Sequence, residues 1–134
     1  MNREEQKCLV LVVDDDFNFA DAVEVALIYH GFTPYVAHVG NAGIQKFNMY
    51  RPDVVVLDLH MPKVGGLKVL KDIKEADADA MVVGLGANEH DKNEARKLGA
   101  DVCINKPITP QAICEIVMGL VGTTITANVA AVGA

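Results

Sequence analysis

The sequence contains no tryptophan, and only 5% of its 134 residues are aromatic. A core built from this composition must rest on Val, Ile, Leu and Ala. Lysine and arginine do not cluster anywhere in the chain, and the net charge is −6. Because nucleic-acid surfaces gain affinity by neutralising phosphates, we expect no direct nucleic-acid binding by this domain.

The sequence also lacks the features of an exported or membrane-inserted chain. Residues 1–7 are polar, and the apolar run after them ends at Asp14, so we expect neither a signal peptide nor a membrane-spanning segment. The cysteines are Cys8, Cys103 and Cys114, an odd number without metal or redox spacing. We therefore predict reduced thiols in the core and a cytoplasmic location.

An apolar run that ends on a carboxylate stands at the centre of the chain. Residues 54–57 are Val, Val, Val and Leu, and Asp58 and then Pro62 follow them. Such a run is typical of a central parallel strand that is covered on both faces. Pro62 and the glycine pair Gly65-Gly66 favour a turn before the next helical pattern. Asp58 is therefore predicted at the carboxyl end of a core strand, where open α/β sheets bind their ligands.

Strand patterns alternate with helix patterns along the whole chain. The expected strands are residues 8–13, 33–39, 54–57, 80–85 and 101–105, and the expected helices are residues 19–30, 41–48, 67–73, 89–98 and 110–120. This alternation predicts crossover connections and a doubly wound, five-stranded parallel sheet of the α/β class. Pro34 cannot donate a hydrogen bond to a neighbouring strand, so residues 33–39 are expected at an edge.

The length of the chain predicts one domain. We assign residues 1–122 to this domain and residues 123–134 to a C-terminal tail or truncated linker, because the latter are small and uncharged. A frayed end or an added strand would also fit this composition.

Several residues follow the predicted strands directly and are therefore expected to converge at one sheet edge. These residues are Asp14 to Asp16, Asp58, Gly86 and Lys106, and Asp16 is expected to cap the next helix rather than to bind a metal. Clustered carboxylates raise one another's pKa unless a cation relieves them, and Mg²⁺ accepts oxygen ligands together with phosphate oxygens. Such a site can hold a phosphoryl group beside a carboxylate nucleophile, with a lysine on another phosphoryl oxygen. The pattern predicts phosphoryl transfer onto Asp58.

Three motifs carry a resemblance to a known family. Asp14-Asp15 after the first strand, Asp58 in Asp-Leu-His-Met-Pro, and Lys106-Pro107 after the last strand resemble the receiver domain of two-component response regulators, over residues 9–120. The resemblance implies a flavodoxin-like fold with strand order 2-1-3-4-5. It also implies a phosphoacceptor in a phosphorelay, with a histidine kinase or histidine phosphotransfer protein as its partner. The domain would be no enzyme beyond autocatalytic phosphorylation and dephosphorylation.

The same resemblance assigns roles by position. Asp58 would be the phosphoacceptor and Lys106 the lysine that contacts the phosphoryl group. Asp14 and Asp15 would form the acid pair of the metal site. Asp15, Asp58 and the main-chain carbonyl of His60 would hold Mg²⁺.

Two positions depart from the family pattern. Gly86 stands where the family has Ser or Thr, and Cys103 stands where it has an aromatic residue. In the family these two positions move together when the domain switches. We therefore expect the phosphorylation chemistry to survive, while conventional signal propagation is weakened or rerouted.

Other classes of protein remain open at this point. A nucleotide- or flavin-binding domain would need a phosphate loop rich in glycine or hydroxyl groups, whereas the first loop here carries three aspartates. A small aspartate-dependent phosphatase would normally carry a second acid where this chain has His60. A receiver-like interaction module that works without phosphorylation is the more serious alternative. The sequence does not decide whether the chain forms a homodimer.

Overall fold

The computed structural model describes residues 8–133 and contains a five-stranded sheet in the order β2-β1-β3-β4-β5. All four strand pairings are parallel. The strands are β1 (Leu9–Val13), β2 (Thr33–Ala37), β3 (Val54–Asp58), β4 (Met81–Gly86) and β5 (Val102–Asn105). The helices are α1 (Phe17–Tyr29), α2 (Gly40–Tyr50), α3 (Gly66–Ala76), α4 (Glu89–Lys97) and α5 (Pro110–Gly133). The doubly wound fold, its strand order and the edge position of β2 are confirmed.

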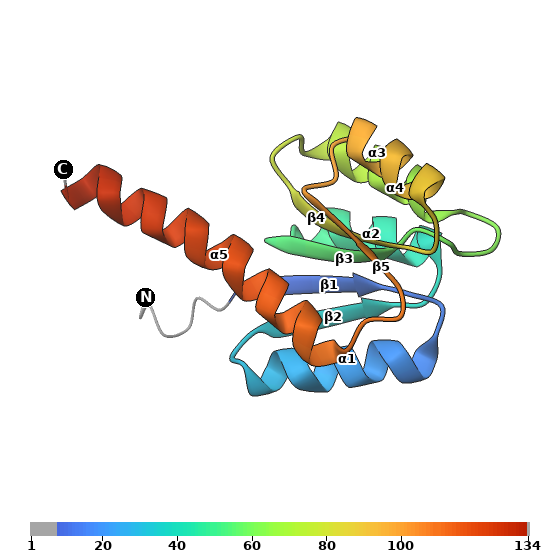
Figure 1. Cartoon of the computed structure of the whole chain (residues 1–134), viewed down its shortest axis with the longest axis horizontal. Coiled ribbons are helices and arrows are strands. Elements are labelled where there is room, and N and C mark those ends of the chain that lie inside the picture. The colour runs from blue at the N-terminus through green and yellow to red at the C-terminus, as the bar shows by residue number, and fades with distance from the viewer. Residues whose placement is uncertain (1–7, 134) are drawn as a thin grey trace.

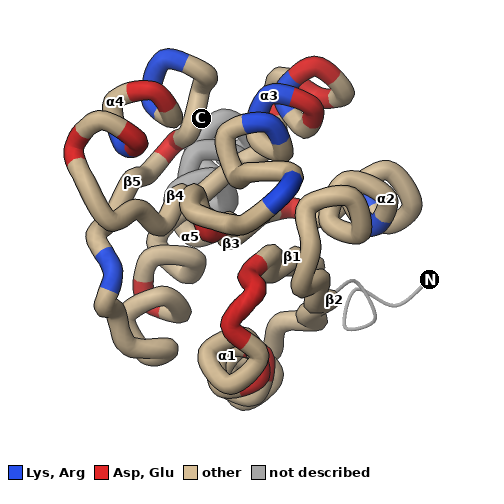
Figure 2. Tube along the Cα trace, turned by 90° about the vertical axis from the view of Figure 1, so that its right-hand side faces the viewer, with Lys and Arg blue, Asp and Glu red and all other residues tan. Residues whose placement is uncertain are grey.

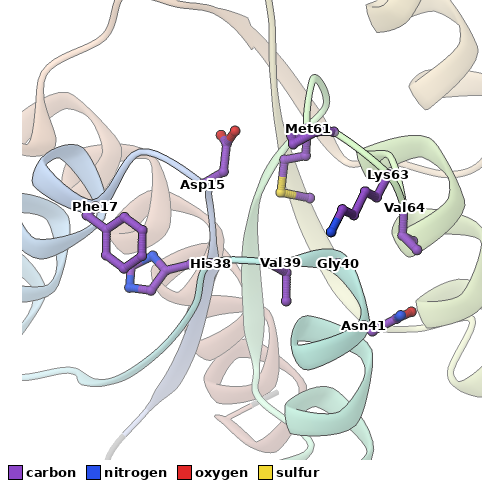
Figure 3. A pocket seen from close by; sticks show the side chains of 10 residues that line it. Asp15, Phe17, His38, Val39, Gly40, Asn41, Met61, Lys63 and Val64 are labelled. Carbon is purple, nitrogen blue, oxygen red and sulfur yellow. The ribbon is translucent and has the colours of Figure 1, made fainter.

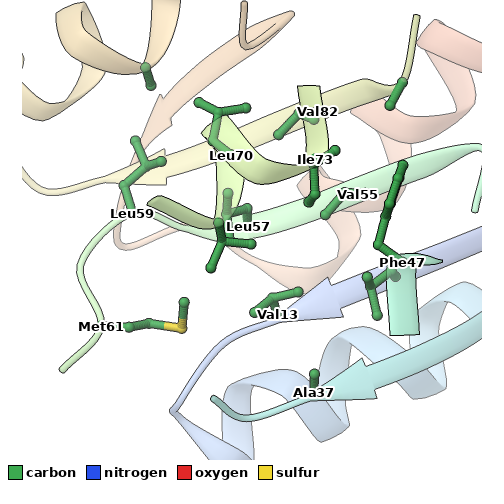
Figure 4. Close-up of a cluster of buried hydrophobic side chains, with 14 residues drawn as sticks. Val13, Ala37, Phe47, Val55, Leu57, Leu59, Met61, Leu70, Ile73 and Val82 are labelled. Carbon is green, nitrogen blue, oxygen red and sulfur yellow. The ribbon is translucent and has the colours of Figure 1, made fainter. Parts of the chain in front are cut away.

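The helices cover the two faces of the sheet in two groups. α1 and α5 lie on one face, and α2, α3 and α4 lie on the other (Figure 1). Alternate residues of β3 enter the two cores, because Val54 and Val56 pack with α1 and α5 while Val55 and Leu57 pack with α2 and α3 (Figure 4). The uninterrupted apolar run of β3 is therefore explained by burial on both faces.

Side chains cap the N-terminal ends of two helices. Asp16 caps α1, and its side chain accepts a hydrogen bond of 3.1 Å from the main-chain nitrogen of Phe19. Pro110 is the first residue of α5, and the hydroxyl of Thr109 accepts a bond of 3.1 Å from the nitrogen of Ala112. These caps determine where the loops end at the edge of the sheet.

Three expectations need correction. β2 ends at Ala37 rather than at residue 39, because α2 begins at Gly40. α5 continues to Gly133, so residues 123–133 are helical and an added strand there is wrong. Cys8 and Cys103 are only half-buried, while Cys114 is buried in the core. Cys8 stands just before β1 and Cys103 lies on an edge strand, so neither is fully enclosed.

The polar segment 1–7 lies outside the described residues. Within the described part of the chain, no helix combines the length and the apolar character needed to cross a membrane.

The start of α3 packs directly against the main chain at the end of β3. A Cβ atom on Gly66 would lie 2.2 Å from the carbonyl oxygen of Asp58 and 2.5 Å from the Cα of Leu59. Only glycine permits this approach, because both neighbours are backbone atoms that cannot rotate away. The contact holds the end of β3 against the first turn of α3.

We predict that Gly66→Ala destabilises the protein by about 1 to 3 kcal/mol, since the new methyl group must displace the backbone. Urea unfolding would measure the loss as a lower midpoint. Gly119→Ala is the matched control, because a Cβ at Gly119 has no neighbour within 4 Å and alanine favours a helix by about 1 kcal/mol. Equal midpoints for the two variants would contradict the steric argument.

Candidate functional site

Three aspartates meet at the carboxyl edge of the sheet. Asp14 follows β1, Asp58 is the last residue of β3, and their exposed fractions are 1% and 4%. Asp15 is exposed, and one carboxylate oxygen from each of the three residues lies within 4.8 Å of the others. Figure 2 shows the acidic stretch between β1 and α1 at this edge. The structure thus brings together three of the acids that the sequence places after strands.

Main-chain hydrogen bonds orient the two buried carboxylates. Asp14 accepts a bond of 2.9 Å from the nitrogen of Asp16 through Oδ1, and its own nitrogen donates to the carbonyl of Ala37 at 3.0 Å. Asp58 accepts a bond of 2.9 Å from the nitrogen of His60 through Oδ1. Each carboxylate is therefore held by the loop that follows its own strand.

Lys106 places one ammonium group between the two buried acids. Its Nζ donates to Asp14 Oδ2 at 2.8 Å and lies 3.5 Å from Asp58 Oδ2. The same ammonium lies 4.9 Å from the centre of the Phe19 ring, and the main-chain nitrogen of Lys106 donates to the carbonyl of Gly86 at 2.9 Å. The lysine is therefore anchored to β4 while its charge reaches β1 and β3.

Burial dominates the electrostatics of Asp58. Loss of solvation raises the pKa of Asp58 from 3.8 to about 6; the negative charge of Asp14 adds to the rise, while the His60 amide and Lys106 oppose it. Burial lowers the pKa of Lys106, but the hydrogen bonds and charges of Asp14 and Asp58 outweigh it, so this pKa is raised and the ammonium stays charged. One cation thus faces three acids, and their all-oxygen donor set fits a hard divalent ion such as Mg²⁺.

The other residues singled out in the sequence lie around this centre. Asp16 caps α1 and does not join the acidic cluster. His60 is exposed, although its neighbours Leu59 and Met61 are buried. Gly86 is buried at the end of β4. Cys103 lies on the neighbouring strand β5, where it pairs with Gly84.

Sequence reasoning missed a cavity beside Asp15. Its volume is about 450 Å³, and it lies between the loops that follow β1, β2 and β3 (Figure 3). The rings of Phe17 and His38 stack at its side with centroids 3.8 Å apart, and His38 Nδ1 lies 3.1 Å from the carbonyl oxygen of Asp14. His38 follows β2 directly, so the same strand-end argument that placed Asp58 could have placed it.

Sequence reasoning also missed Lys92 of α4, which is only 6% exposed and whose stem lies against Gly86. The helical pattern of α4 contains few apolar residues and gives no signal that a lysine occupies its inner side.

Comparisons with known proteins agree with this geometry. The family model of the response regulator receiver domain matches residues 10–118. The transcriptional regulatory protein TrcR of Mycobacterium tuberculosis is 35% identical over 113 residues, which cover 83% of this chain and 44% of that protein. The chain thus spans about half the length of the curated relatives it matches.

Solved structures show the same fold. A CheY-like receiver domain protein from Methanospirillum hungatei superposes with a TM-score of 0.85 at 19% identity, covering 91% of this chain and 99% of its own. The receiver domain of the Francisella response regulator 1452 gives a TM-score of 0.80 at 28% identity, with coverages of 88% and 99%.

We predict that Asp58→Asn stabilises the metal-free protein at neutral pH by about 1 to 2 kcal/mol. Because the folded-state pKa of Asp58 is raised to about 6, the folded protein binds more protons there than the unfolded chain between about pH 4 and pH 6. The wild type therefore loses stability as pH rises through this window, and the benefit of the variant should vanish near pH 4.

Urea unfolding across this pH range, with a chelator present, would measure the difference. Asp21→Asn on the exposed side of α1 removes the same charge and serves as the control. A benefit of Asp58→Asn that does not depend on pH would contradict the desolvation argument.

Proposed function

The chain belongs to the receiver domain family of two-component response regulators, and we propose that Asp58 accepts a phosphoryl group in the presence of Mg²⁺. The donor would be a phosphorylated histidine of a histidine kinase or histidine phosphotransfer protein. The observation that carries the proposal is the buried Asp58 carboxylate at the end of the central strand, with Lys106 Nζ 3.5 Å away.

Each side chain of the site has a role in this step. A carboxylate oxygen of Asp58 forms the new bond to phosphorus as the phosphorus–nitrogen bond of the donor breaks, and the donor imidazole keeps the electron pair. Lys106 neutralises the charge of a phosphoryl oxygen. Its hydrogen bond to Asp14 already positions the ammonium group at the site. With its pKa at about 6, Asp58 is still ionised and nucleophilic at neutral pH.

The acid cluster would hold the metal. Asp14, Asp15, Asp58 and the main-chain carbonyl of His60 are the oxygen ligands that we assign to Mg²⁺. The bound ion would bring the phosphoryl oxygens against the acids and neutralise their charge. Because Asp15 is exposed, the ion and the donor would reach the site from solvent.

We limit the proposed partners to proteins. The curated relative is a transcriptional regulatory protein, but residues 10–118 of this chain match the receiver domain alone. With a net charge of −6, these residues would transmit a signal by protein contacts rather than by binding DNA.

A receiver-like interaction module that works without phosphorylation is the second candidate. Gly86 offers no hydroxyl group for a phosphoryl oxygen, and Cys103 supplies no aromatic ring on β5. These two departures favour this alternative, and metal-dependent labelling of Asp58 separates it from the phosphoacceptor.

The first experiment is incubation with acetyl phosphate and Mg²⁺. The intact mass should rise by one phosphoryl group in the wild type and in Asp21→Asn, and the gain should be lost in Asp58→Asn and in a chelated sample. A beryllium fluoride titration runs beside it, because this anion mimics the phosphoryl group without needing a reactive donor. If the wild type shows neither labelling by acetyl phosphate nor binding of beryllium fluoride, the phosphoacceptor function is refuted and the interaction module remains.

The atypical position on β4 can be tested separately. We predict that Gly86→Thr changes the lifetime of the phosphoryl group severalfold, because it adds a hydroxyl beside Asp58. Gly86→Ala adds the same Cβ without the hydroxyl and is the matched control. If both variants keep the wild-type lifetime and partner preference, the missing hydroxyl affects neither the retention of the phosphoryl group nor the choice of partner.

A further inference from the structure

Lys92 is the only lysine or arginine that is buried among the residues the structure describes. It lies in α4, and its side chain is 8% exposed. Lysine is rarely buried unless its ammonium group is paired, since desolvating the charge is costly. Its position therefore needs an explanation.

The stem of Lys92 fills the space that a side chain at position 86 would occupy. A Cβ atom on Gly86 would lie 2.9 Å from Lys92 Cγ and 3.7 Å from Lys92 Cδ. Leu59 Cδ1, 3.4 Å from the same point, closes the other side. Lys92 thus runs across the last residue of β4, the residue that follows the pairing partner of Asp58 in the sheet.

The ammonium group of Lys92 has an exposed partner. Nζ lies 2.7 Å from Glu89 Oε1, and the Glu89 side chain is 72% exposed. Glu89 is the first residue of α4, only three residues after Gly86. The ammonium is therefore held at the edge of the sheet that also carries Asp58, by an ion pair that solvent weakens.

Phosphorylation would change the balance of charges at this edge. A phosphoryl group adds roughly −1.5 to −2 charge and strong acceptor oxygens, one strand away from Gly86. No hydroxyl stands at position 86 to donate to these oxygens. The stem of Lys92 already crosses that position, and its ammonium group is a hydrogen-bond donor.

We propose that Lys92 takes the place of the missing hydroxyl and binds the phosphoryl group on Asp58. Its Nζ exchanges Glu89 for a phosphoryl oxygen, and this exchange draws the first two turns of α4 toward the site. The inference rests on the proposed phosphoacceptor function. It assigns a signalling contact to a residue of α4 rather than to the end of β4.

The movement would reach β5 through Cys103. Its Sγ lies 3.7 Å from the main-chain carbonyl of Lys92, and burial raises the pKa of this thiol. A shift of α4 would uncover the sulfur. The rate at which Cys103 is alkylated is therefore a local readout of the position of Lys92.

Two variants with opposite expected effects test the proposal in a titration with beryllium fluoride and Mg²⁺. Lys92→Met keeps the apolar stem but loses the donor, so binding should weaken about tenfold. Glu89→Gln removes the competing carboxylate, so binding should tighten severalfold. The ion pair Lys97–Glu94 has the same spacing on the same helix, and Lys97→Met and Glu94→Gln should leave the affinity unchanged.

The rate of alkylation of Cys103 is the second measurement. Peptide masses distinguish the alkylation of Cys103 from that of the other cysteines. Beryllium fluoride should accelerate alkylation in the wild type and not in Lys92→Met. If Lys92→Met does not fold, Glu89→Gln still decides, because its side chain is exposed. The role of Lys92 is overturned if the wild type binds the anion and neither Lys92→Met nor Glu89→Gln alters this binding, or if both variants weaken it. These outcomes leave the phosphoacceptor function intact. A wild type that neither binds the anion nor is labelled overturns the phosphoacceptor itself.

Discussion

The buried carboxylate of Asp58 is the constraint on which the site depends. The sheet places this acid at the end of its most enclosed strand, where loss of water raises the pKa to about 6. The surrounding structure offsets part of this cost with an amide from His60 and the ammonium of Lys106. A negatively charged centre with one cation remains, and it is suited to a ligand that brings positive charge.

The sequence was sufficient for the fold because its strongest signals are local. Continuous apolar runs mark β1, β3 and β4, and the caps Asp16 and Thr109 mark where two helices begin. The end of β2 was misjudged, since Val39 is apolar and extended like a strand residue but serves as the N-cap of α2. The tail was underdetermined for a similar reason: small uncharged residues after Leu120 suit several conformations.

The part of the candidate site that follows strand ends was equally readable from the sequence. Parallel topology alone brings Asp14, Asp15, Asp58 and Lys106 to one edge. What topology does not specify is which side chain fills a particular space. Lys92 lies on a helix rich in charge, where periodicity assigns every lysine to solvent. Its burial follows from the absence of a side chain at Gly86. Gly86 and Lys92 belong to different elements, and no local sequence pattern relates the two residues.

This shared space has an evolutionary consequence. Because the Lys92 stem lies where a Cβ of residue 86 would be, neither position can change freely while the other stays the same. Relatives with a hydroxyl-bearing residue at position 86 would have to shorten or redirect the residue at position 92, and relatives with glycine can keep a long unbranched residue there. The two positions should therefore covary among close relatives of this chain.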